Sequence, residues 1–153
     1  MNATVTTLHP GDIALGERGD RFETLLGSCV SIILTDPRRT IGTMCHFVHA
    51  RTPVTGSSHD TAHAQAAFDA MVARLAERGL AARLCDAFVI GGGNMFPQLD
   101  PDAAIGDHNV DRALALLAAS GIRVIAQDVG GDFYRRVRWS VGPDAPEVLL
   151  TAT

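Results

Sequence analysis

Two apolar runs separated by a short polar turn constrain the fold of this chain most strongly. The first run extends from Val30 to Leu34, and the second extends from Ile41 to Val48. Between them stands Asp36-Pro37-Arg38-Arg39, a segment rich in turn-forming residues. Runs of this length, bounded by such residues, are typical of β-strands, so the sequence predicts a hairpin here. Pairing of its strands would bring residues that are distant in sequence side by side.

A cysteine and a histidine occupy matching places on this predicted hairpin. Cys29 directly precedes the first run, and His46 lies within the second. A thiol beside an imidazole is the arrangement of a nucleophile with its base, and Gly27 allows a backbone that approaches closely. Cysteine is also among the most buried residue types and often only fills a core. The residues alone leave both interpretations open.

Further blocks of sequence follow in a fixed order from Thr24 to Val141. They are Thr24 to Ser31 with Asp36-Pro37, Gly42 and His46; Ile90 to Phe96; Ile105-Gly106 with Asn109-Val110; and Asp128 to Gly131 with Arg136 and Val137. Each block is weak alone, but the ordered set resembles the CheD family of chemoreceptor glutamine deamidases. The resemblance implies an α+β fold, a mixed β-sandwich flanked by helices, for a single CheD-like domain over residues 1–153.

The hydrophobic pattern predicts the same fold class. Apolar positions at helical spacing predict a helix from Ser58 or Asp60 to Gly79 and a second from Asp107 to Gly121. Alternating or apolar runs predict further strands, at Ala87 to Ile90, Arg123 to Gln127, Val137 to Val141 and Glu147 to Thr151. Hairpin neighbours and helical crossovers together imply a sheet of mixed direction.

Composition excludes several classes of protein. With 153 residues, 46% of them hydrophobic, the chain suffices for one compact domain. Its net charge of −4 gives no general attraction to nucleic acid, and Arg135, Arg136 and Arg138 are interpreted as a solvated strand face. No basic and apolar leader or membrane-length apolar run is present, and the three cysteines are an odd number. We therefore expect a cytoplasmic protein with reduced thiols and no membrane insertion.

The implied reaction, hydrolysis of an amide, requires specific roles of Cys29 and its neighbours. The thiol must ionise, so we expect its pKa to be lowered by a His46 imidazolium or by backbone dipoles. The resemblance implies a threonine six positions before the cysteine as third member of a triad, but that position holds Glu23, and Thr24 is one residue off register. Alternation along a strand prevents both from facing His46. We predict Glu23 as the partner, with Thr24 as the alternative.

Backbone groups near the cysteine are predicted to bind the substrate. The N–H groups from Ser28 to Val30 are candidates for an oxyanion site, and Gly27 permits close approach. The resemblance places the turn Gly91 to Gly93 beside the active site, which makes Gly92 and Asn94 further candidates. A phosphate site at this turn fits less well, because Pro97 interrupts the following segment.

A metal site is a competing interpretation. Its ligands would be drawn from Cys45, His46, His49, His59, His63 and Cys85. Cys45 and His46 point to opposite faces of a strand, so they diverge where zinc needs convergent ligands. The prediction is therefore an enzyme without metal or cofactor.

The resemblance implies a protein-glutamine deamidase that hydrolyses specific glutamines of chemoreceptors in chemotaxis adaptation. Its partners would be the cytoplasmic domains of those receptors, and recognition would combine the glutamine side chain with a helical face. The alternative is a binding module that docks to receptors or to a CheC-type phosphatase with little or no catalysis. The two hypotheses differ at Cys29, which only the deamidase requires.

Overall fold

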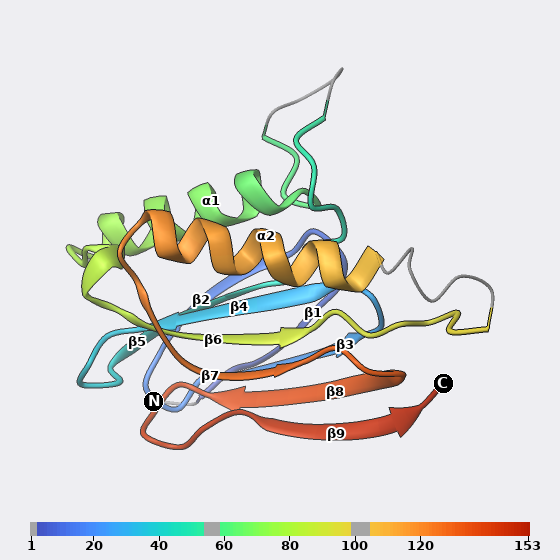
Figure 1. Cartoon of the computed structure of the whole chain (residues 1–153). Coiled ribbons are helices and arrows are strands. Elements are labelled where there is room, and N and C mark those ends of the chain that lie inside the picture. The colour runs from blue at the N-terminus through green and yellow to red at the C-terminus, as the bar shows by residue number, and fades with distance from the viewer. Residues whose placement is uncertain (1–2, 54–58, 99–104) are drawn as a thin grey trace.

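The computed structural model describes residues 3–53, 59–98 and 105–153 of the chain, and two β-sheets and two α-helices make up this part (Figure 1). The elements are, in order, β1 Val5–Leu8, β2 Ile13–Glu17, β3 Arg21–Leu26, β4 Val30–Thr35, β5 Ile41–Cys45, α1 Ala64–Glu77, a 3₁₀ turn Ala82–Leu84, β6 Asp86–Gly91, α2 Ile105–Ala119, β7 Arg123–Val129, β8 Phe133–Ser140 and β9 Glu147–Ala152.

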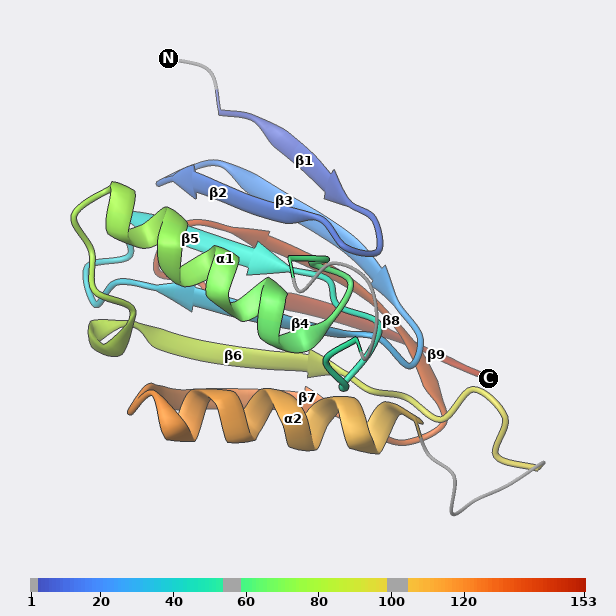
Figure 2. The same ribbon diagram turned by 90° about the horizontal axis from the view of Figure 1, so that it is seen from above.

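The two sheets are both mixed in direction. One has four strands in the order β1-β3-β8-β9, in which only β1 and β3 are parallel. The other has five strands in the order β2-β5-β4-β6-β7, in which only β6 and β7 are parallel. Both helices cover the outer face of the five-stranded sheet, as the two views show (Figures 1 and 2). The predicted α+β fold, a mixed sandwich flanked by helices, is confirmed.

The two faces of the five-stranded sheet bury two separate cores. Alternate residues of β4 divide between them: Ile32 and Leu34 pack under the helices, whereas Ile33 packs between the sheets. Strand β4 is buried along its whole length because both faces are covered. The second core holds Trp139 of β8 and Phe22 of β3, whose ring centroids are 6.0 Å apart. The candidate site lies against this second core, since Cys29 packs on it.

Each helix begins at a different residue from the one predicted. The N-cap of α1 is His63, because Asp60 instead accepts a hydrogen bond from the Ala62 N–H in the preceding turn; Ser58 lies outside the described residues. Helix α2 already includes Asp107 in its first turn. The predicted glycine ends are confirmed, with φ of 75° at Gly79 and 68° at Gly121.

The N-terminal strands were not predicted, and two predicted segments differ in detail. Strands β1 and β2 are short and lack a long apolar run, so β-propensity alone does not reveal them. Strand β8 starts at Phe133, four residues earlier than expected. Its Arg135 is only 3% exposed, so this residue is not part of a solvated face, unlike Arg136 and Arg138.

The glycine turn after β6 fixes the start of α2 against the sheet. Gly92 has a φ of 67°, and a Cβ there would lie 2.7 Å from the Gly106 carbonyl oxygen. A Cβ on Gly106 would in turn lie 2.3 Å from the Gly92 carbonyl oxygen. Only two glycines permit this approach, which brings α2 within reach of the loop that carries Cys29.

Neither helix of the described ranges has the length and apolar character that crossing a bilayer requires.

Candidate active site

The register of the β4–β5 hairpin places Cys29 and His46 on one face. Beyond the ladder of the two strands, Val30 and Phe47 exchange both backbone hydrogen bonds, at 3.1 and 3.0 Å. His46 therefore stands opposite Ser31, and Cys29 lies one diagonal step away on the same face. This is the face between the sheets, where Cys29 packs against the second core. Its side chain remains partly exposed, whereas His46 is 3% exposed.

Thr24 of β3 reaches across from the other sheet and hydrogen-bonds the His46 ring. The Thr24 Oγ1 to His46 Nδ1 distance is 2.8 Å, and the same hydroxyl donates to the Leu8 carbonyl at 2.8 Å. Because its one proton is directed to Leu8, the hydroxyl accepts a hydrogen bond from Nδ1–H. The neutral ring then carries its proton on Nδ1 and its lone pair on Nε2. That Nε2 is buried and has no hydrogen-bond partner among the described residues.

Glu23 does not contact His46, contrary to the preference expressed from the sequence. Its side chain lies on the opposite face of β3, where its carboxylate is 3.6 Å from Arg138 and 4.0 Å from Arg21. The pairing of β3 with β8 sets this orientation: Thr24 pairs with buried Val137, and Glu23 pairs with exposed Arg138. The adjacent threonine, rather than the glutamate, is the residue placed to orient the imidazole.

Burial keeps both members of the pair neutral. It lowers the pKa of His46 to about 4, against a smaller opposing effect of the Asp12 carboxylate. Burial also raises the pKa of the Cys29 thiol above its ordinary value. These directions differ from the expected thiolate and imidazolium. At neutral pH this face carries a thiol and a neutral imidazole that are not hydrogen-bonded to each other, and the lone pair of Nε2 is free, as general-base catalysis requires.

The loop that carries Cys29 is held by three hydrogen bonds from elements distant in sequence. Gly92 N–H donates to the Cys29 carbonyl at 2.9 Å, and Gly93 N–H donates to the Gly27 carbonyl at 3.0 Å. Buried Asn109 of α2 donates from Nδ2 to the Ser28 carbonyl at 3.0 Å and to the Val48 carbonyl at 2.9 Å. Asn109 thus ties the cysteine loop to the strand that carries His46. Sequence reasoning missed this role, although Asn109 stands in one of the blocks that carry the family resemblance.

Some of the N–H groups predicted to bind the substrate are already hydrogen-bonded within the protein, and others have no backbone acceptor in the described part of the chain. Val30 N–H is bonded to the Phe47 carbonyl, so it is not available to a substrate oxyanion. Among the described residues, the N–H groups of Ser28 and Cys29 donate to no backbone carbonyl, and the Cys29 N–H lies near its own sulfur. These two groups are therefore the candidate donors to an oxyanion. Gly92 N–H already holds the loop, as described above. Asn94 N–H donates to Gly131, and its Oδ1 accepts from Phe96 N–H in a local turn.

Apolar side chains surround Gly27, the glycine that precedes the nucleophile loop. A Cβ at this position would lie 2.8 Å from Met95 Sδ and 3.5 Å from the Tyr134 ring. Tyr134 is 42% exposed, and the neighbouring Phe133 is 36% exposed. The glycine therefore makes room for a rim that presents apolar surface next to Cys29.

The metal interpretation finds no support in the geometry. Across residues 3–53, 59–98 and 105–153, no group of three potential ligands is arranged to hold an ion. His49 and His63 stack, with ring centroids 4.7 Å apart. The other thiols are buried, and burial raises the pKa of Cys45 to about 12 and that of Cys85 to about 11.

The pKa directions predict how Cys29 responds to alkylation. With the thiol pKa raised, the rate of carbamidomethylation by iodoacetamide should increase steadily with pH through 9 and show no plateau near neutrality. Cys45 and Cys85 should remain unmodified in the folded protein. Mass spectrometry of tryptic peptides after timed quenching measures both. A pH-independent rate between about 6 and 8 would instead reveal a preformed ion pair.

Comparisons with known proteins identify the family of this chain. The sequence model of the family described as CheD chemotactic sensory transduction matches residues 49–144. A probable chemoreceptor glutamine deamidase CheD 3 from Dechloromonas aromatica is 36% identical in an alignment that covers 92% of this chain and 87% of the relative. CheD 1 from Chromobacterium violaceum, also named a probable chemoreceptor glutamine deamidase, is 34% identical over 88% of this chain and 71% of its own.

A third relative has a similar identity to this chain. The probable chemoreceptor glutamine deamidase CheD of Methanococcus vannielii is 34% identical over 83% of this chain and 82% of its own length. Matches of this identity and coverage run across both sheets and both helices. The chain belongs to the CheD family of chemotaxis proteins.

Proposed function

We propose that this protein hydrolyses glutamine side chains of chemoreceptors to glutamate, with Cys29 as nucleophile and His46 as base. The observation that carries the proposal is the Thr24–His46 hydrogen bond, because it leaves the lone pair of Nε2 free on the face that Cys29 shares. The names of the relatives identify the substrate of those proteins as chemoreceptor glutamine. We place the activity in the cytoplasm, as part of adaptation.

Acylation begins with transfer of the Cys29 proton to His46 Nε2 as the sulfur attacks the amide carbon. The carbonyl oxygen becomes an oxyanion, which the N–H groups of Ser28 and Cys29 stabilise. The imidazolium formed in this step donates from Nδ1–H to Thr24, and the Asp12 carboxylate favours its charge. Nε2–H then protonates the departing nitrogen, so ammonia leaves and a thioester remains.

Deacylation returns the site to its starting state. A water molecule gives its proton to Nε2 and adds to the thioester carbon, and the same two N–H groups stabilise the second oxyanion. The carbon–sulfur bond breaks, His46 returns its proton to the thiolate, and glutamate is released. The new carboxylic acid then gives its proton to ammonia. The net reaction consumes one amide and one water and yields one carboxylate and one ammonium ion.

The apolar rim around Gly27 supports a macromolecular substrate. Met95 and Tyr134 border Gly27, and Phe133 and Tyr134 expose apolar surface beside the cysteine loop. A helical segment of a receptor could bury this surface while its glutamine side chain reaches Cys29. Free glutamine has no counterpart for the rim, so we expect it to be a poor substrate.

Replacement of the nucleophile tests the proposal. A cognate receptor cytoplasmic fragment incubated with the protein should gain the mass of a Gln to Glu conversion, and Cys29→Ala should abolish this gain while remaining folded. The measurement is mass spectrometry of receptor peptides, with circular dichroism as the folding control. Retained receptor binding by Cys29→Ala is compatible with either hypothesis. If the unaltered protein binds receptors but modifies no glutamine, it is a docking module instead.

The position of Thr24 generates a second test. Thr24→Val removes the acceptor of the Nδ1–H hydrogen bond, and loss of one such buried partner costs about 1 to 3 kcal/mol. If that loss falls on the transition state, kcat/KM for deamidation decreases roughly 5- to 150-fold. Thr24→Ser should recover most of the activity. Glu23→Gln, the matched change on the opposite face, should stay within about twofold of the unaltered protein, since exposed ion pairs contribute little. The reverse order of effects would refute the assignment.

A further inference from the structure

Strand β9 is an exposed edge without the protection that the other three sheet edges have. Edge strands that stay unpaired are generally short, charged, bulged or covered. The β2 edge lies beside α1, where Arg74 Nη1 donates to the Ile13 carbonyl at 2.9 Å. The β7 edge contacts α2 and has a register shift against β6, and β1 has only four residues.

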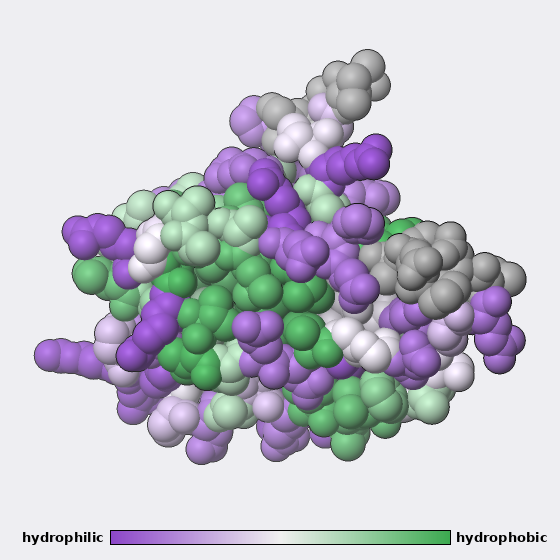
Figure 3. All heavy atoms as spheres, in the orientation of Figure 1, coloured by the Kyte–Doolittle hydropathy of each residue, from purple (hydrophilic) through white to green (hydrophobic). Residues whose placement is uncertain are grey.

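Strand β9 has little of this protection, since its one charged residue is Glu147 at its first position. Its segment Val148 to Ala152 carries no charge and no proline, and its pairing with β8 is continuous over six residue pairs. Leu149 and Leu150 are 64% and 49% exposed. Figure 3 shows apolar atoms gathered at the lower edge of the molecule, at the level of β9 in Figure 1.

The hydrogen-bond pattern shows which backbone groups of β9 are open. Thr153 N–H donates to the Asp132 carbonyl across an aligned antiparallel pair. In such a ladder alternate residues bond to the neighbouring strand, so Glu147, Leu149 and Thr151 face β8. The N–H and C=O groups of Val148, Leu150 and Ala152 therefore point to the free edge, where no described residue pairs with them.

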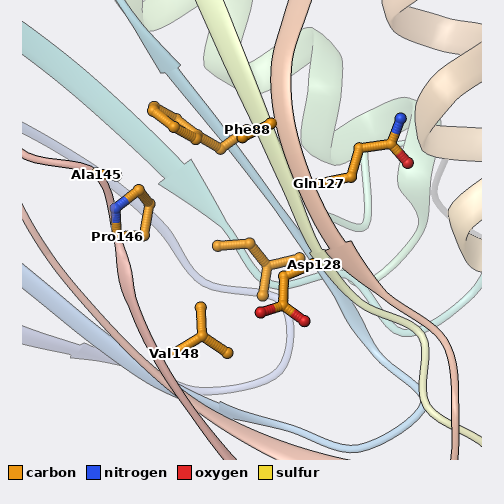
Figure 4. A pocket seen from close by; sticks show the side chains of 8 residues that line it. Phe88, Gln127, Asp128, Ala145, Pro146 and Val148 are labelled. Atoms are coloured by element: carbon orange, nitrogen blue, oxygen red, sulfur yellow. The ribbon is translucent and has the colours of Figure 1, made fainter.

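A groove between the two sheets runs beside this edge. Its volume is about 360 Å³, and its apolar lining comes from Phe88, Ile90, Ala126, Pro146 and Val148 (Figure 4). Strand β7 forms its other side. Seen from above, β7 and α2 lie outside β9 (Figure 2). If a second copy paired with this one through its own β9, the β7 and α2 of both copies would occupy the same space. A single added strand carries no such elements and avoids this clash.

The outer face of the sheet supplies a charge preference. Arg136 stands opposite Leu149 in the β8–β9 register. Glu147, the one carboxylate of β9 on this face, stands opposite Arg138. Within the described ranges Arg136 forms no ion pair, and Glu23 interacts with Arg21 and Arg138. The outward face beside β9 therefore carries two guanidinium groups and one carboxylate, and a strand added there would place its outward side chains near net positive charge.

We propose that β9 binds an extended segment of a partner protein as a fifth strand of the four-stranded sheet. The segment pairs with Val148, Leu150 and Ala152, directs alternate apolar side chains into the groove, and carries acidic side chains on the outward face near Arg136. The surface adjoins the apolar rim, because Ala152 pairs with Phe133. It contains none of the residues to which the proposed chemistry assigns a role, so this interaction does not depend on deamidation.

A synthetic strand tests the proposal. The probe is a fluorescein-labelled peptide of alternating glutamate and valine, and its control has N-methylated valines, which cannot donate to the edge. Fluorescence polarisation with the full chain should show saturable binding of the probe and at least roughly tenfold weaker binding of the control. A peptide of alternating lysine and valine should bind more weakly than the probe, and Arg136→Gln should reduce this difference.

Leu150→Pro removes an N–H that points to the free edge but bonds to no described residue, so it should weaken the probe at least roughly tenfold without unfolding the sheet. Thermal melting checks the fold, and the N-methylated peptide keeps the test valid if this variant is unstable. Equal binding of both peptides, or no binding, would overturn the proposal. Self-association in analytical ultracentrifugation that Leu150→Pro abolishes would assign the edge to a second copy instead.

Discussion

One hydroxyl group connects the two sheets at the point where the proposed chemistry takes place. Thr24 Oγ1 belongs to the four-stranded sheet, yet it contacts the ring of His46 in the hairpin of the five-stranded sheet. Its own proton is directed to the Leu8 carbonyl, so its role toward the imidazole is fixed as acceptor. The orientation of the base therefore depends on how the sheets pack, and the whole sandwich is needed to produce one correctly placed lone pair.

The second requirement is a cysteine loop that does not move relative to that base. Backbone groups of the glycine turn and the side chain of Asn109 hold the loop from two directions. The close contact of Gly92 with Gly106 makes this possible, because it brings α2 down to the turn. Fixed positions of nucleophile and base lower the barrier to attack. This matters here because Cys29 and His46 are both neutral before the reaction and the proton must transfer during the attack.

The sequence was informative wherever local pattern decided the structure, and silent where packing between the sheets did. Apolar runs predicted the hairpin and the later strands, and the glycines predicted where both helices end. The choice between Glu23 and Thr24 depended on which face of β3 turns inward. The pairing of β3 with β8 decides which of these two side chains faces His46, and the sequence near Cys29 does not reveal that pairing. Arg135 was misplaced for the same reason, since its arginine neighbours suggested a solvated face.

The most direct test of this account is the protonation state of His46, observed by ¹⁵N NMR of the imidazole nitrogens in the full chain at neutral pH. The account predicts a neutral ring with its proton on Nδ1 and a bare Nε2, which Thr24→Val should destabilise. A ring protonated on Nε2 or on both nitrogens would contradict it. Nε2 could not then take a proton from Cys29, and the Thr24–His46 hydrogen bond would not have the role assigned to it.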